Sequence, residues 1–340
     1  MNWKIAVVGA TGNVGREMLN VLAERLAGAE VAALASRKSM GVEVSFGERT
    51  LRCQDLAQYD FRGTDIVLMS AGGVVSKEWS PKIARAGAVV IDNSSAWRMD
   101  PAVPLVVPEV NGATLARYAK KNIVANPNCS TIHRVVALKC LHDEAAITRI
   151  VTSTYQSVSG AGKDAMDELF RQSRAIFVGD PVERAKFPKQ IAFNVIPQVD
   201  AFLDDGSTKE EEKQATETRK ILGPDIKVSA TCVRVPVFRG HGEACTVEFE
   251  RPLSAQRAKV LLRNAPGVML VDRHEDGGYI TPLETAGDDE VYVGRVRNDP
   301  TVANGLSLWI ASDNLRKGAA LNAVQIAEAL IAEHLKKRIA

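Results

Sequence analysis

The chain has 340 residues, of which 46% are hydrophobic and 25% are charged, and its formal net charge is +2. That composition is typical of a globular protein with two domains. The balanced charge argues against nucleic acid or a membrane surface as a partner, and no run of about 18 apolar residues predicts a transmembrane helix. The five cysteines are scattered without a C-x-x-C pair, so we expect no disulfide framework, no bound metal and a cytoplasmic location.

The first part of the chain alternates predicted strands and helices. KIAVVGA (residues 4–10) is a short apolar run ending in glycine, which is typical of a buried parallel strand, and we expect no signal peptide before it. Hydrophobic spacing predicts helices over residues 13–26 and 76–87. Because strands joined by right-handed crossovers form a doubly wound sheet, we expect a Rossmann-type α/β domain. Its further strands are predicted at residues 30–35, 64–71 and 88–95.

After about residue 150 the pattern becomes rich in β-branched residues. Alternating stretches predict strands that surround helical segments, which indicates an α+β domain with a mixed or antiparallel sheet. The tail, residues 318–339, has the spacing of an amphipathic helix that packs back on the first domain. We therefore expect a first domain over residues 1–128, completed by a helix at 313–340, and a second domain over 129–312. The predicted strands of the second domain include residues 149–158, 227–237 and 244–250.

The stretch GATGNVG places glycines at positions 9, 12 and 15, directly after a predicted strand and at the start of a helix. Gly9 suits a tight turn, Gly12 lets the backbone approach a pyrophosphate, and Gly15 lets the helix pack on the strand. The helix N-terminus adds N–H groups and a partial positive charge. The context favours a dinucleotide site over a glycine-rich turn that binds nothing.

The end of the second strand indicates which dinucleotide binds. An NAD site usually has Asp or Glu there for the ribose hydroxyls. This chain has Ser36, Arg37, Lys38 and Ser39 instead. Cations and hydroxyls suit a 2′-phosphate, so we expect NADP, although a solvated turn is the ordinary role of such residues.

The stretch NPNCST, residues 126–131, places a thiol directly after three turn-forming residues. If a helix starts near Cys129, with Asn128 as its cap, the helix dipole and free N–H groups favour the thiolate. A nucleophilic thiol beside a nicotinamide indicates chemistry through a thiohemiacetal and a thioester. The alternative, a buried inert cysteine, is the better interpretation for the other four cysteines.

The thiol needs a base, and two of the five histidines are candidates. His133 follows Cys129 by four residues and lies on the same face if this segment is a helix. His241 lies between Gly240 and Gly242, where a break in a predicted strand would present the ring to a cleft. We favour His241, chiefly because of a resemblance to a known family.

The chain resembles bacterial aspartate-β-semialdehyde dehydrogenase over nearly its whole length. Eleven motifs carry the resemblance in sequence order, which makes it far more specific than any single motif. They are GATGNVG, LASRKSMG, SAGG, VIDNSSAWRMD, VPLVVPEVN, NPNCST, STYQSVSGAG, FNVIPQ, EEEKQATETRKIL, RVPVFRGH and DNLRKGAA.

The resemblance implies a role for each matching position. Cys129 matches the nucleophile, His241 the general acid/base, and Gln156 the residue that orients the intermediate. Arg234 matches the arginine that binds the substrate carboxylate, and Glu210 the residue that receives the ammonium group. Arg98 and Lys213 match the phosphate-binding pair. These charges suit the charges of the substrate, although an exposed helical pair is the ordinary role of Glu210 and Lys213.

The resemblance also implies reversible reductive dephosphorylation of L-4-aspartyl phosphate, in which Cys129 forms the thioester, phosphate leaves and NADPH is the reductant. That reaction serves lysine, threonine, methionine and diaminopimelate biosynthesis. A homodimer is implied, formed mainly through the second domain. The implied cofactor-binding positions are Gly9, Thr11, Gly12, Asn13, Val14, Ser36, Arg37, Ser39, Ser70, Gly72, Ser159, Gly160 and Asn314.

The chain departs from the family pattern just after the thiol. The family commonly has glutamine and then apolar residues, whereas this chain has His133 and Arg134, and Cys140 stands where proline is common. These residues lie on the predicted nucleophile helix and bear on the pKa of Cys129. Two alternative functions are N-acetyl-γ-glutamyl-phosphate reductase, which usually has glycine before the thiol where this chain has Asn128, and a non-catalytic NADP-binding paralogue, which would be expected to lose the thiol.

Overall fold

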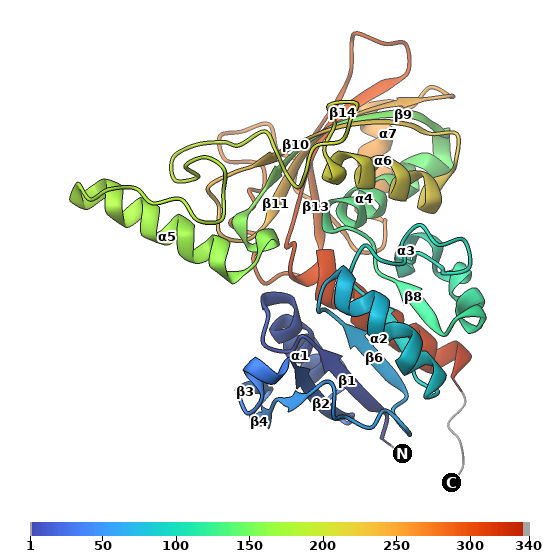
Figure 1. Ribbon diagram of the computed structural model, residues 1–340. Helices are drawn as coiled ribbons and strands as arrows, with labels where there is room; N and C mark the ends of the chain where they lie inside the picture. The colour runs from blue at the N-terminus through green and yellow to red at the C-terminus, as the bar shows by residue number, and fades with distance from the viewer. Residues whose placement is uncertain (1, 336–340) are drawn as a thin grey trace. The chain divides into compact units, whose positions relative to one another are not determined.

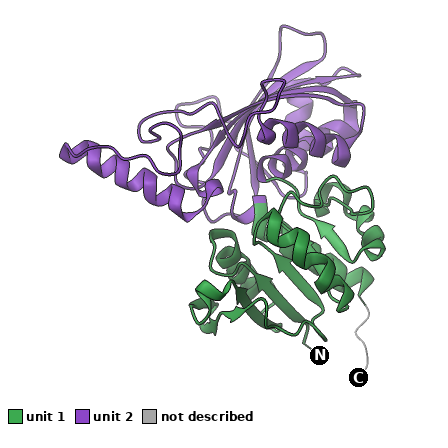
Figure 2. Ribbon diagram, in the orientation of Figure 1, with its two compact units in different colours: residues 1–128, 319–340 green, residues 129–318 purple. Residues whose placement is uncertain are grey.

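The computed structural model describes residues 2–335. The chain divides into two compact units (Figure 2): unit 1 comprises residues 1–128 and 319–340, and unit 2 comprises residues 129–318. The helix that returns to the first domain was expected to begin at residue 313. Residues 313–318 belong to unit 2 in the structure, because Asn314 accepts hydrogen bonds there from Ser157 Oγ at 3.1 Å and Gly240 N at 3.0 Å.

Unit 1 is built on a six-stranded parallel sheet, which confirms the predicted Rossmann-type class (Figure 1). Its strand order, β5-β2-β1-β6-β7-β8, reverses direction between β1 and β6. The central strands are apolar and buried on both faces, as expected for a sheet covered by helices on both sides. The strands are β1 (Lys4–Val8), β2 (Glu30–Ala35), β5 (Gln54–Asp55), β6 (Ile66–Met69), β7 (Val89–Asp92) and β8 (Ile123–Ala125).

Helices α1 (Asn13–Arg25) and α2 (Gly73–Arg85) occupy the predicted positions. Three short helices, α3 (Pro108–Asn111), η1 (Arg37–Ser39) and η2 (Gly112–Lys120), lie in the connections. A hairpin formed by β3 (Glu43–Phe46) and β4 (Arg49–Arg52) was not predicted, because both strands are short and largely polar.

The C-terminal segment differs from the single amphipathic helix expected at 313–340. It consists of a π-helical segment η4 (Arg316–Leu321), α8 (Asn322–Ala329) and a second π-helical segment η5 (Leu330–His334), and residues 336–340 lie outside the described part of the chain. Val324, Ile326 and Leu330 join the same apolar cluster as residues of β1 and α1. The helix therefore completes the core of unit 1 and is buried around most of its circumference.

Unit 2 contains a six-stranded mixed sheet with the order β10-β9-β11-β14-β13-β12. Only the two outermost pairs, β10 with β9 and β12 with β13, are parallel. The predicted α+β class with a mixed sheet is confirmed. The strands are β9 (Ile147–Gln156), β10 (Lys227–Arg234), β11 (His241–Phe249), β12 (Val268–Leu270), β13 (Val291–Asn298) and β14 (Gly305–Ser312).

Three helices of unit 2 cover one face of this sheet: α4 (Cys129–Ala145), α6 (Lys209–Leu222) and α7 (Ala255–Arg263). A 3-10 turn η3 (Val158–Ala161) leads into α5 (Lys163–Val178), which projects away from the sheet (Figure 1). Val158 and Leu169 form a small separate core with Ile191. Among the described residues, no helix is long and apolar enough to cross a membrane.

Candidate functional site

In unit 1, the predicted cofactor residues follow the carboxyl ends of three neighbouring strands. Gly9 and Ala10 follow β1, and their N–H groups donate to Leu34 O of β2 at 2.9 and 3.1 Å. Gly9 has φ +81°, and a Cβ added there would lie 2.4 Å from Ser70 O, which follows β6. The loops after β1, β2 and β6 therefore meet where the strand order reverses, which is where open α/β sheets bind ligands.

The glycine turn leaves space for a ligand at the start of α1. Gly12 is the N-cap residue of α1 and is exposed. Its backbone position carries no side-chain hydrogen bond to the helix N-terminus. A Cβ on Gly15 would lie 2.1 Å from Gly9 O, so only glycine lets α1 begin this close to the turn. The residues present fit a dinucleotide pyrophosphate at a helix N-terminus. The other predicted cofactor residues of unit 1 lie at the same edge, none of them buried: Thr11, Asn13, Val14, Ser36, Arg37, Ser39, Ser70 and Gly72.

In unit 2, a second cluster gathers at one end of the sheet. Gln156 is the last residue of β9, and Arg234, the last residue of β10, pairs with it in register. His241 is the first residue of the antiparallel strand β11, so it lies at the same end. Cys129 is the first residue of α4, as the turn residues before it predicted.

His241 is completely buried, and its two ring nitrogens have different surroundings. Nδ1 accepts a hydrogen bond from Ser157 N at 3.1 Å and lies 3.0 Å from Ser157 Oγ, whereas Nε2 has no hydrogen-bond partner. The N–H donated to Nδ1 assigns the hydrogen of the neutral ring to Nε2. Burial, together with the neighbouring His133 and Arg234, holds the pKa of His241 well below its usual 6.5. The ring is thus neutral and presents an N–H to the site.

The prediction that a strand breaks around His241 is wrong, because β11 begins at His241 and continues through Gly242. Gly242 serves packing, since a Cβ there would lie 2.4 Å from the ring of Trp309. Gly240 has φ +88°, and a Cβ there would lie 2.1 Å from Pro282 O. The two glycines therefore hold the start of the strand in place and do not lift the ring out of it.

Glu210 and Gln156 form a buried polar contact beside this end of the sheet. Gln156 Nε2 donates to Glu210 Oε1 at 3.1 Å, and Glu210 is only 5% exposed. Lys213, one turn later on α6, donates to Glu210 Oε2 at 3.3 Å and to Asp200 Oδ2 at 2.7 Å. Burial alone lowers the pKa of Lys213, but the two carboxylates outweigh it and leave the pKa raised. The ordinary alternative, an exposed helical pair, is wrong for Glu210.

Arg234 faces the same cluster. It is 7% exposed, and its Nη1 donates to Ser157 O at 2.7 Å. Burial lowers its pKa, and the carboxylate of Glu210 acts in the opposite direction. A Cβ on Gly160 would lie 3.2 Å from Arg234 Nη1 and 3.5 Å from His241 Nε2, so glycine keeps space open between the two.

Two predicted cofactor residues, Ser159 and Asn314, lie around His241. Asn314 Oδ1 accepts from the hydroxyls of Ser157 and Ser159 at 3.1 and 3.2 Å, and its Nδ2 donates to Ser159 Oγ at 2.9 Å. Ser157 therefore links Asn314, Arg234 and His241. Ser157 was not among the residues predicted from the sequence, although it lies within the motif STYQSVSGAG directly after Gln156.

His133, the rival base, lies next to the thiol. A Cβ on Gly318 would lie 2.7 Å from Cys129 Cβ and 2.8 Å from His133 Nε2, so both atoms border one small space that only glycine leaves open. His133 Nε2 is buried without a hydrogen-bond partner. Burial and the charge of Lys317 lower the pKa of His133 to about 3, although a hydrogen bond to the Asp313 backbone raises it.

The other cysteines have the character of inert thiols. Burial raises the pKa of Cys140 to about 11 and that of Cys232 and Cys245 to about 12. Cys53 is buried, and burial raises its pKa as well. A thiol that stays protonated is a poor nucleophile.

Arg98 belongs to unit 1, unlike the rest of the predicted substrate-binding set. Its Nε donates to Asn126 O at 3.0 Å and its Nη2 to Asn93 O at 2.9 Å, which holds the buried side chain against the loops after β7 and β8. Unit 2 brings together the other predicted residues: Cys129, Gln156, Glu210, Lys213, Arg234 and His241.

Both units match known protein families. Residues 4–118 match the family described as semialdehyde dehydrogenase, NAD binding domain, and residues 138–317 match semialdehyde dehydrogenase, dimerisation domain. The aspartate-semialdehyde dehydrogenase of Aquifex aeolicus is 52% identical over 339 residues, which covers 98% of this chain and 100% of the relative. The enzyme of the same name from Rickettsia conorii is 51% identical over 334 residues, covering 98% and 99%.

Solved structures agree with these relatives. Aspartate semialdehyde dehydrogenase II of Vibrio cholerae, complexed with ASA, has a TM-score of 0.96 and 48% identity, and covers 98% of this chain and 100% of that one. Aspartate semialdehyde dehydrogenase of Candida albicans, solved with NADP, has a TM-score of 0.75 and 26% identity, and covers 98% and 99%.

Proposed function

The chain belongs to the aspartate-semialdehyde dehydrogenase family of oxidoreductases, and we propose that it interconverts L-4-aspartyl phosphate and L-aspartate 4-semialdehyde with NADP, through a thioester on Cys129. One observation carries the assignment of the site. Cys129 starts α4 in the same unit whose sheet end holds His241, Arg234 and Gln156. The relatives support this function and not the N-acetyl-γ-glutamyl-phosphate reductase alternative.

The proposed cofactor site is the edge of unit 1 formed by the loops after β1, β2 and β6. The N-terminus of α1 would hold the pyrophosphate, and the exposed Arg37, with Ser36 and Ser39, would hold the 2′-phosphate. Ser159, Gly160 and Asn314 of unit 2 are proposed to contribute to nicotinamide binding. When bound, NADP carries the hydride to or from the substrate carbon.

The proposed chemistry of the thiol is acyl transfer. In the direction of reduction, the Cys129 thiolate attacks the acyl carbon of aspartyl phosphate, a C–S bond forms, and inorganic phosphate leaves with the electrons of the C–O bond. After hydride is transferred to the thioester carbon, the oxyanion of the thiohemiacetal accepts a hydrogen bond from His241 Nε2. Collapse of that oxyanion re-forms the C=O bond and breaks the C–S bond, which releases the semialdehyde and returns the thiolate to Cys129. The N–H groups of the first turn of α4 stabilise the oxyanion.

The charges of unit 2 match an amino-acid substrate. Arg234 would bind the α-carboxylate through its guanidinium fork, Glu210 the ammonium group, and Lys213 with Arg98 the phosphate. The buried contact between Gln156 and Glu210 holds the anion in place before substrate arrives. A free ammonium group distinguishes this substrate from an N-acetylated one, because only the free ammonium adds a further charged hydrogen bond to the buried carboxylate of Glu210, which Lys213 already contacts.

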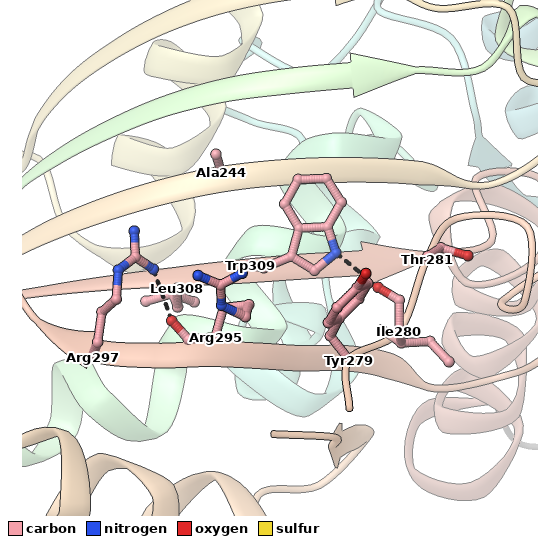
Figure 3. Close-up of a pocket in the computed structure, with 8 residues that line it drawn as sticks. All are labelled: Ala244, Tyr279, Ile280, Thr281, Arg295, Arg297, Leu308 and Trp309. Atoms are coloured by element: carbon pink, nitrogen blue, oxygen red, sulfur yellow. Dashed lines mark hydrogen bonds between the residues drawn. The ribbon is translucent and has the colours of Figure 1, made fainter. Parts of the chain in front are cut away.

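A second copy of the chain is the proposed partner, seated on the sheet face of unit 2 that no helix covers. Tyr155 is 38% exposed there, and its ring lies 5.7 Å from that of Trp309. Ala244 and Arg295 border a pocket of about 300 Å³ on this face, where Trp309 Nε1 donates to Ile280 O (Figure 3). The match of residues 138–317 to a dimerisation domain supports this choice of partner.

The test is NADPH formation by the purified protein from L-aspartate-β-semialdehyde, with and without inorganic phosphate. We expect phosphate-dependent turnover that is lost in Cys129→Ala, absent with N-acetylglutamate semialdehyde, and slower with NAD than with NADP. NADP binding without turnover would favour the non-catalytic alternative. A cytoplasmic location stays part of the proposal, since all five cysteines are free thiols in the structure.

A further inference from the structure

Arg134 is a fully buried arginine that the proposed chemistry does not use. It follows His133 on α4 and is 0% exposed. A guanidinium removed from water costs several kcal/mol unless its donors are satisfied. The hydrogen bonds of Arg134 must therefore offset the free-energy cost of burying its charge.

The contacts of Arg134 reach two other elements. Its Nη1 donates to Glu243 Oε2 of β11 at 3.1 Å. Its Nη2 donates to Gln214 Oε1 at 2.7 Å and to Thr218 Oγ1 at 2.9 Å, both on α6. A single side chain thus ties α4 to β11 and to α6. We name the contact with Glu243 the β11 arm, and the contacts with Gln214 and Thr218 the α6 arm.

The elements α4, β11 and α6 each carry a residue of the proposed site close to the hydrogen bonds of Arg134. Cys129 begins α4, five residues before Arg134. His241 lies two residues before Glu243, so the two side chains are on the same face of β11. Glu210 lies one helical turn before Gln214 on α6.

We propose that Arg134 is a positioning residue, which holds His241 in place through the β11 arm and the substrate-binding residues of α6 through the α6 arm, both relative to Cys129. The inference rests on the proposed function. Misplacement of reacting groups by about 1 Å costs on the order of a hundredfold in rate. The planar guanidinium provides two donor nitrogens at a fixed angle, which a lysine ammonium does not.

A purely structural role makes a different prediction. Removing one partner of a buried ion pair is destabilising, because the other charge is left without compensation. If Arg134 only stabilised unit 2, variants in its two arms would lower the melting temperature and leave kcat and KM unchanged. A positioning role predicts that the two arms affect different kinetic constants.

The experiment removes the contacts of each arm separately, by side-chain substitutions in the full chain. Gln214→Leu combined with Thr218→Val removes the side-chain acceptors of the α6 arm, and Glu243→Gln removes the charge from the β11 arm. Turnover is measured above neutral pH, because burial raises the pKa of Glu243 to about 7, opposed by Arg134. We expect the α6 variant to raise KM for the semialdehyde about tenfold with little change in kcat, and Glu243→Gln to lower kcat about tenfold with little change in KM.

Two further variants complete the design. Arg134→Lys keeps the charge without the fork, and we expect it to fold and to stay well below parental activity. Arg257→Met is the control: Arg257 Nε donates to Glu144 Oε1 at 2.9 Å and so ties α7 to the other end of α4, and we expect unchanged kinetics.

The inference is overturned if folded arm variants keep parental constants, if both arms change the same constant, or if Arg134→Lys restores full activity. Melting temperatures identify the folded variants. The parent is assayed first: absence of phosphate-dependent turnover in the parent contradicts the proposed function. An active parent with unaffected arm variants contradicts only the positioning role.

Discussion

His133 and His241 are both buried in unit 2, and the Nε2 of each ring has no hydrogen-bond partner. Ser157 N donates to Nδ1 of His241, so the Nε2 of His241 is an N–H donor. A Cβ added at Gly160 would lie 3.2 Å from Arg234 Nη1 and 3.5 Å from His241 Nε2, so the two groups border one space. A donor in that position stabilises a developing oxyanion. This placement supports His241 over His133 as the residue that contacts the substrate oxygen.

Replacing each histidine by glutamine tests this assignment. We expect His241→Gln to lower kcat by about 10²–10³-fold, because the Nε2 donor held beside the substrate oxygen is lost. We expect His133→Gln to retain kcat within about tenfold of the parent, a smaller loss than removal of an oxyanion donor produces. Steady-state kinetics for the semialdehyde provide the measurement. The assignment would be reversed by a larger loss in His133→Gln than in His241→Gln.

The low pKa of His133 also links stability to pH. The folded state holds the pKa at about 3, below the ordinary 6.5. The unfolded chain therefore binds the proton first as the pH falls below 6.5, and the free energy of unfolding decreases by up to about 1.4 kcal/mol per pH unit. In His133→Gln we expect the free energy of unfolding, measured with urea, to decrease less between neutral and mildly acidic pH than it does in the parent.

The matched control for this measurement is His274→Gln. His274 is exposed in the same unit. We expect this variant to keep the parental pH dependence. If the free energy of unfolding decreased equally per pH unit in the parent and in His133→Gln, the link between the pKa of His133 and stability would be contradicted.

At the scale of elements, the glycine turn after β1 shows how local backbone geometry determines a site. Gly9 has φ +81° and approaches the loop after β6 so closely that no side chain fits. That approach brings the ends of β1 and β6 together at the N-terminus of α1. The turn, and not a particular side chain, therefore forms the centre of the proposed cofactor site.

Gly9→Ala tests this turn. A Cβ at Gly9 would lie 2.4 Å from Ser70 O, and the backbone angle disfavours alanine as well. We expect NADP binding, measured by titration calorimetry, to weaken at least about tenfold, because the turn must shift. Gly28→Ala is the control, since nothing lies within 4 Å of a Cβ there, and we expect unchanged binding. Equal binding in both variants would show that the turn is not part of the cofactor site.

At the scale of the whole molecule, unit 2 presents apolar groups to solvent on the sheet face that its helices leave uncovered and around α5. Phe177 and Phe193 are 79% and 63% exposed, and their rings lie 5.5 Å apart. Exposed apolar surface of this kind is typical of protein interfaces. Its presence in the segment that matches a dimerisation domain favours self-association.

Ala244→Arg tests the proposed dimer face. Ala244 is exposed on β11, at the pocket lined by Trp309 and Tyr279. A second copy on this face would bury the new arginine without a partner, so we expect the dimer to dissociate in sedimentation experiments. Gln256→Arg on α7, which covers the opposite face, is expected to leave the association state unchanged. A dimer retained in Ala244→Arg would place the interface elsewhere.

The sequence alone was sufficient for features that depend on local order. Hydrophobic spacing predicted β1, α1, β2 and α2, and turn residues predicted that a helix begins at Cys129. These features depend on residues close together in the chain, so their pattern is visible in one stretch. The hairpin β3–β4 was missed because its strands are short and largely polar. The strands β12 to β14 were also missed, although β14 alternates the buried Leu306, Leu308 and Ile310 with less buried residues.

Pairing between segments far apart in the sequence determined how the residues of the candidate site are arranged. Only the register of β9, β10 and β11 brings Gln156, Arg234 and His241 to one end of the sheet. The contact of Gln156 with Glu210, the hydrogen bond from Ser157 to His241, and the ion pair of Arg134 with Glu243 join segments that lie 54 to 109 residues apart. Local composition carries no information about which distant groups will meet, because their meeting depends on how the strands pair and the helices pack.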